Sequence, residues 1–81
     1  MLKNEALVII SKEHLNRYSF FEDGYPHENE VVIKKVNNIW KVFATDERAA
    51  VQGAVNIHNT ESEALIEFVE RLRAGKILDS L

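Results

Sequence analysis

The sequence predicts an α+β domain, with an antiparallel sheet of three or four strands and an N-terminal and a C-terminal helix packed on one face. Two β-branched and aromatic runs, 30–36 and 39–45, flank the turn-forming pair Asn37-Asn38, and a third alternating run follows at 51–58. A capped amphipathic helix then begins after Thr60. The chain of 81 residues is 46% hydrophobic and 28% charged, which predicts one compact domain over 1–81.

The N-terminal segment favours a helix. Asn4 is a candidate N-cap, and an apolar stripe follows at three- and four-residue spacings: Leu7, Ile10, His14, Leu15 and Tyr18. The β-branched run 8–10 is also compatible with a short strand, so helix and strand both stay open for residues 6–10. The segment 18–29 contains Gly24 and Pro26, which predict a long irregular loop with a short edge strand near Phe20 or Phe21.

The hairpin 30–45 is the part around which the rest is expected to pack. Asn37 and Asn38 tolerate the positive φ angles of a tight turn. Trp40, the only tryptophan, shares one strand face with Val42 and Ala44, and we expect it in the middle of the sheet. Full burial there predicts that Trp40→Ala costs about 3–5 kcal/mol.

The last strand and the last helix have clear patterns. In the run 51–58 Val51, Val55 and Ile57 alternate with polar residues on the other face, as in a half-buried strand. The sequence Thr60-Glu61-Ser62-Glu63 is a capping box, and a buried stripe follows it: Ala64, Leu65, Phe68, Val69 and Leu72. We expect Gly75 to end this helix, and most of its glutamates, Glu61, Glu63, Glu67 and Glu70, to face solvent. The apolar tail 77–81 then packs on the core or on a partner.

The sequence lacks the features that several classes of function require. The longest apolar run, 6–10, is too short to span a membrane, and a net charge of −3 with no basic cluster argues against nucleic acid as a ligand. The absence of cysteine excludes disulfides and suits a cytoplasmic location. His14, His27 and His58 lack the spacing of metal ligands, and no catalytic motif is present. We therefore expect no enzyme activity, no metal and no cofactor.

The order of the motifs resembles that of the small α+β immunity proteins of bacterial polymorphic toxin systems, most closely the immunity protein 59 family. The motifs are Trp40-Lys41-Val42-Phe43, then Glu47-Arg48, then Thr60-Glu61-Ser62-Glu63-Ala64, within residues 30–72. The chain departs from the family pattern at Ala49, where glycine is expected after the Glu-Arg pair. The resemblance implies a non-enzymatic protein that binds and neutralises a cognate toxin domain, with Glu47 and Arg48 as the residues carried over.

Charge patterning predicts where the toxin binds. Acidic residues gather in the loop before the hairpin and in the turn after it, on segments that a core does not need. The predicted contact residues are Glu22, Asp23, Glu28, Glu30, Asp46, Glu47 and Arg48. We expect about one strand length between the two groups unless the loop folds back toward the turn. The alternative function is a small structural or regulatory homo-oligomer, and an immunity protein can itself form a homodimer through the apolar tail or an edge strand.

Overall fold

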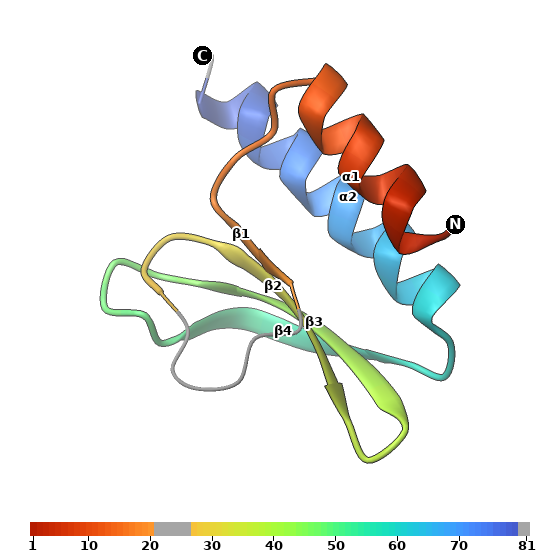
Figure 1. The fold of residues 1–81 in the computed structure, drawn as a ribbon. Helices are drawn as coiled ribbons and strands as arrows, with labels where there is room; N and C mark the ends of the chain where they lie inside the picture. The colour runs from red at the N-terminus through yellow and green to blue at the C-terminus, as the bar shows by residue number, and fades with distance from the viewer. Residues whose placement is uncertain (21–26, 80–81) are drawn as a thin grey trace.

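The structure is a computed structural model that describes residues 1–20 and 27–79. In these ranges the chain forms α1 (Lys3–Lys12), β1 (Tyr18–Phe20), β2 (Val31–Val36), β3 (Ile39–Thr45), β4 (Val51–His58) and α2 (Glu61–Asp79). The strands form one sheet in the order β1-β2-β3-β4. Both helices lie side by side over the same face of this sheet (Figure 1). The predicted α+β fold is confirmed.

The hairpin has the predicted turn. Asn37 and Asn38 have φ angles of 50° and 66°, and Val36 lies opposite Ile39. The same antiparallel register places Val31, the first residue of β2, opposite Ala44 near the end of β3. We call the region where the two strands meet their flanking segments, residues 27–31 and 44–50, the open end of the hairpin.

The sheet is mixed, so the prediction of an entirely antiparallel sheet is wrong at one edge. β1 pairs with β2 in parallel, with Tyr18 opposite Val31. The predicted helical stripe placed Tyr18 on the N-terminal helix, but α1 ends at Lys12. His14 and Arg17 have φ angles of 54° and 59°, which reverse the chain between α1 and β1.

The N-terminal segment is a helix, as favoured, but its details differ from the prediction. Leu2 is the N-cap in place of Asn4, and its backbone N–H donates to the Glu5 carboxylate at 3.2 Å. The buried face consists of Ala6 and Ile10, whereas Leu7 is exposed. A small residue at position 6 lets α1 approach α2 closely, which explains why the larger Leu7 is not the core residue.

The core lies between the two helices and the covered face of the sheet. Ile33 and Val42 contribute from the sheet, and Leu65, Phe68 and Val69 from α2. Trp40 lies in central strand β3 as predicted, but it is only partly buried at the edge of this core. The predicted α2 stripe of Ala64, Leu65, Phe68, Val69 and Leu72 is fully confirmed.

The helix α2 continues through Gly75 to Asp79, so the predicted stop at Gly75 is wrong. A glycine inside a helix costs about 1 kcal/mol relative to alanine, yet nothing lies within 4 Å of the place where its Cβ would be. Ile77 and Leu78 are therefore helical, and they are exposed by 63% and 69%. Neither helix in the described part of the chain is long and apolar enough to cross a membrane.

Candidate functional site

A buried hydroxyl holds the open end of the hairpin together. Thr45 is 3% exposed, and its Oγ1 accepts the backbone N–H of Glu30 at 3.0 Å and donates to the carbonyl of His27 at 2.6 Å. The backbone N–H of Thr45 also donates to the carbonyl of Glu30 at 2.8 Å. These bonds fix the segment that enters β2 against the end of β3.

The turn after β3 is fixed by its own aspartate. The Asp46 carboxylate accepts the backbone N–H groups of Arg48 at 2.8 Å and of Ala50 at 3.1 Å. In the same turn Ala49 has a φ of 60°, a left-handed conformation that glycine adopts without strain. This conformation gives a physical reason for the glycine that the family pattern has at this position.

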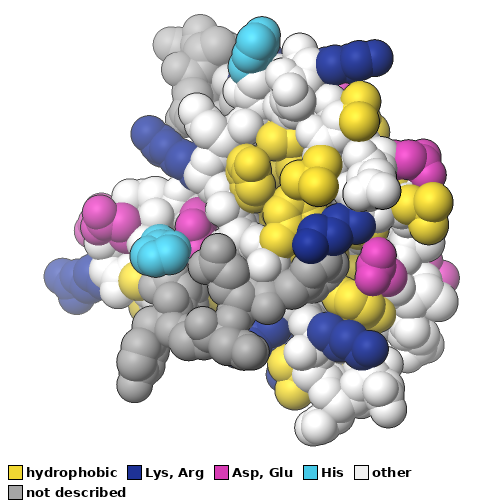
Figure 2. Space-filling model, in the orientation of Figure 1, with side chains coloured by type: hydrophobic (Ala, Val, Ile, Leu, Met, Phe, Trp, Pro, Cys, Tyr) yellow, Lys and Arg dark blue, Asp and Glu magenta, His cyan; other side chains and the backbone are white. Residues whose placement is uncertain are grey.

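Of the two predicted groups of charged residues, the described members Glu28 and Glu30 lie beside the turn that begins at Asp46. The backbone N–H of Asn29 donates to the carbonyl of Asp46 at 3.0 Å. The expected separation of one strand length is therefore wrong, because an antiparallel hairpin brings the start of its first strand beside the end of its second. Charged and imidazole side chains gather over these turns, at the left edge of the view in Figure 2.

The predicted contact residues have different surroundings at this end. Glu28, Glu47 and Arg48 are exposed. Glu30 is 8% exposed, and its carboxylate accepts the backbone N–H of His27 at 3.1 Å. Glu22 and Asp23 lie outside the described residues. The geometry thus separates three side chains that face solvent from two, Glu30 and Asp46, that hold the backbone.

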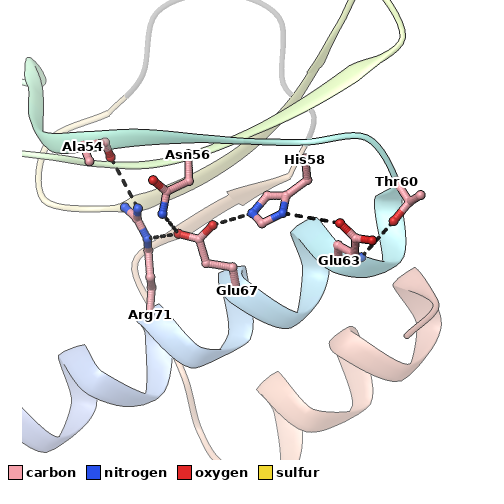
Figure 3. A network of polar contacts seen from close by, with 7 residues as sticks. All are labelled: Ala54, Asn56, His58, Thr60, Glu63, Glu67 and Arg71. Atoms are coloured by element: carbon pink, nitrogen blue, oxygen red, sulfur yellow. Dashed lines mark hydrogen bonds and ion pairs between the residues drawn. The ribbon is translucent and has the colours of Figure 1, made fainter.

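A second polar cluster lies between β4 and α2 (Figure 3). We call Asn56, His58, Glu67 and Arg71 the sheet–helix network. Glu67 is its centre, with His58 Nε2 at 2.5 Å, Asn56 Nδ2 at 2.7 Å and Arg71 Nε at 2.6 Å from its carboxylate oxygens. Arg71 also donates from Nη2 to the carbonyl of Ala54 at 3.3 Å. At the start of α2 one half of the predicted capping box is present, since Thr60 Oγ1 accepts the Glu63 N–H at 3.3 Å, while the Glu63 carboxylate lies 4.0 Å from His58 Nδ1.

This network inverts the expected orientation of the last strand. The polar face of β4 lies under α2, and the apolar residues Val51, Val55 and Ile57 are exposed by 50%, 41% and 60%. Alternation in the sequence indicated that the apolar face would be half-buried, but it could not show that hydrogen bonds would direct Asn56 and His58 toward α2.

Glu67 is therefore a packed residue and not part of a solvated helix face. Burial raises its pKa, but hydrogen bonds from His58, Asn56 and Arg71 outweigh burial, so that the pKa lies below its ordinary value. Sequence reasoning missed this network. A sequence pattern that could have indicated the network is the four-residue spacing of Glu63, Glu67 and Arg71 on one helix face. Polar residues also alternate in the strand before this helix.

The chemistry of the open end suits binding. Its exposed charged groups are carboxylates and a guanidinium, on a backbone fixed by Thr45 and Asp46, which gives a partner a fixed charge pattern. In residues 1–20 and 27–79 no group of three or more histidine, aspartate or glutamate side chains is placed to hold a metal ion.

Comparison with protein families gave a match over nearly the whole chain. The model of the family described as Immunity protein 59 matches residues 5–79. Neither curated proteins nor solved structures gave a significant match. The match includes both helices and all four strands.

Proposed function

The chain belongs to the Immunity protein 59 family, and from this membership we propose that it binds and neutralises a cognate toxin domain, without catalysis. The proposal includes a cytoplasmic encounter, to which a chain without cysteine is suited. The family match over residues 5–79 is the observation that carries it. A fixed, charged surface and the lack of a recognisable catalytic motif support action by binding.

The proposed binding face is the open end of the hairpin. Glu28, Glu47 and Arg48 are its exposed members, and Glu22 and Asp23 are included from the sequence. Glu30 and Asp46 belong to the same face as positioning residues, because their carboxylates accept backbone N–H groups. An excess of carboxylates favours a toxin with a basic surface and speeds the encounter by electrostatic steering.

The first experiment is to express the chain with the toxin domain encoded just upstream of it, purify the complex, and measure affinity against salt. We then replace Glu22, Glu28 and Glu47 with glutamine and Asp23 with asparagine. The expected result is an affinity about tenfold or more lower at low salt, mainly through slower association, with a smaller difference at high salt.

A matched variant removes the same charge elsewhere. This variant replaces four glutamates of the two helices with glutamine: Glu5, Glu61, Glu63 and Glu70. It also removes four carboxylates. We expect this control to bind the toxin nearly as the unmodified protein does. The proposed face is wrong if both variants lose the same affinity, and toxin neutralisation itself is refuted if the unmodified chain binds no neighbouring toxin domain.

The exposed apolar residues of β4 favour a second candidate, a structural or regulatory homo-oligomer. β4 is an edge strand, Ile57 is 60% exposed, and Leu78 at the end of α2 is 69% exposed. Edge strands with apolar side chains are prone to pair with another chain. Light scattering on the full chain and on a chain without residues 77–81 tests this candidate. A dimer lost on truncation supports it, and a monomer at high concentration excludes it.

A further inference from the structure

A cavity of about 210 Å³ lies beside the open end of the hairpin. It is bounded on one side by the start of β2 and the end of β3, with Asn29, Glu30 and Thr45 among its lining residues. On the other side it is bounded by the last turns of α2, including Gly75. The cavity therefore adjoins the exposed acidic residues of the proposed binding face.

The lining of this cavity is cationic, although the chain as a whole is acidic. Arg17, Arg71 and Lys76 line it, against the single carboxylate of Glu30. That carboxylate already accepts the backbone N–H of His27. The cavity thus concentrates positive charge in a chain whose net charge is −3.

Two of the three cations, Arg71 and Lys76, are held in place by hydrogen bonds, and both keep free donors. Arg71 uses Nε on Glu67 and Nη2 on the carbonyl of Ala54, which leaves other guanidinium N–H groups. Lys76 donates to the carbonyl of Glu13, and an ammonium has two further donors. No described residue forms a hydrogen bond or ion pair with the side chain of Arg17. An anion in the cavity would find preorganised donors on Arg71 and Lys76 and a further guanidinium on Arg17.

Gly75 keeps the cavity open. Glycine is a poor helix former, yet α2 continues through this position to Asp79. A Cβ here would meet no atom within 4 Å, so close packing does not explain the glycine. A larger side chain at this position would project into space that the cavity now occupies.

We propose that this cavity binds the carboxylate of an aspartate or glutamate side chain of the toxin domain. The inference rests on the proposed function. The volume is below the range of about 300–1,000 Å³ that is usual for small-molecule sites, so a side-chain carboxylate fits better than a nucleotide. The exposed carboxylates of Glu28 and Glu47, on the neighbouring turns, attract a basic surface that carries one acidic residue, so a toxin side chain should bind more tightly than free acetate.

The first experiment tests the cavity without any toxin. Sodium acetate replaces sodium chloride at constant ionic strength and pH 7, and NMR follows the Arg17 Nε–H and the Gly75 amide. We expect both signals to shift in the millimolar range in the unmodified protein and in Gly75→Ala. In Gly75→Leu, the Arg17 Nε–H and the backbone amide of residue 75 should not shift when acetate is added. Because alanine and leucine are better helix formers than glycine, both variants should fold, which circular dichroism checks.

The second experiment uses the toxin complex. Gly75→Leu and, separately, Arg17→Gln should weaken toxin binding at least tenfold, whereas Gly75→Ala binds like the unmodified protein. The inference is overturned if acetate shifts neither signal, if only inorganic phosphate does so, or if Gly75→Leu binds the toxin with full affinity. A chain that binds acetate in the cavity but no toxin overturns the proposed function and leaves the cavity as a carboxylate site.

Discussion

Phe68→Ala is expected to lower the free energy of unfolding of this domain by about 3–5 kcal/mol. Phe68 is 0% exposed, and its ring lies 4.8 Å from that of Phe20 and 6.3 Å from that of Tyr18. It joins α2 to the parallel edge strand β1, so truncation leaves a cavity between two elements. Removing a buried phenylalanine costs about 3–5 kcal/mol. The total for 81 residues is about 4–12 kcal/mol, so this loss is at least about a quarter of the free energy of unfolding.

Trp40→Ala is the matched comparison and should cost less, about 1–3 kcal/mol. Trp40 is only partly buried at the edge of the core, and the Lys35 Nζ lies 5.6 Å from the centre of its ring. Urea unfolding followed by circular dichroism gives both free energies of unfolding, since one variant lacks the fluorescent tryptophan. If Trp40→Ala is the more destabilised variant, the core is centred on the hairpin and not on α2.

Several parts of the fold could be predicted from the sequence alone. Local sequence determined the Asn37-Asn38 turn and the cap at Thr60, because each depends on backbone preferences within a few residues. The buried stripe of α2 followed from its periodicity. The partial burial of Trp40 could not be predicted from the sequence, because burial depends on how far the helices extend over the sheet.

The three features that the sequence predicted wrongly also have physical causes. The parallel β1 depends on a pairing with a strand more than ten residues away, which periodicity cannot reveal. The helix passes Gly75 because tertiary packing and the preceding turns outweigh a local cost of about 1 kcal/mol. Asn56 and His58 of β4 face α2 because they form hydrogen bonds with the Glu67 carboxylate.

The residues of the proposed binding face stay a prediction from the sequence, and the structure adds how their described members are arranged. Sequence patterning singled out Glu28 and Glu47, and the structure brings their segments together through the bond between Asn29 and Asp46. The cavity lined by Arg17 and Lys76 could not be predicted, because its residues come from four segments that meet only in the folded chain.

Replacing Glu67 with glutamine should weaken the fold at neutral pH and reduce its sensitivity to acid. The charged carboxylate takes hydrogen bonds from His58, Asn56 and Arg71. Loss of charge at the centre of this network should cost about 1–3 kcal/mol at pH 7. Because glutamine has nearly the same shape, the loss reports on the charge and not on a cavity.

The pH dependence follows from the lowered pKa of Glu67, in which hydrogen bonds outweigh the opposing effect of burial. A carboxylate with a lower pKa in the folded state stabilises the fold fully above its ordinary value of 4.5. This contribution disappears as the pH falls through the folded pKa. Urea unfolding between pH 7 and pH 3 should therefore show a smaller decrease in the free energy of unfolding for Glu67→Gln than for the unmodified protein.

Glu70→Gln, which removes an exposed carboxylate from the same helix, is the control and should follow the unmodified protein. Equal acid responses for Glu67→Gln and the unmodified protein would mean that ionised Glu67 does not hold β4 against α2.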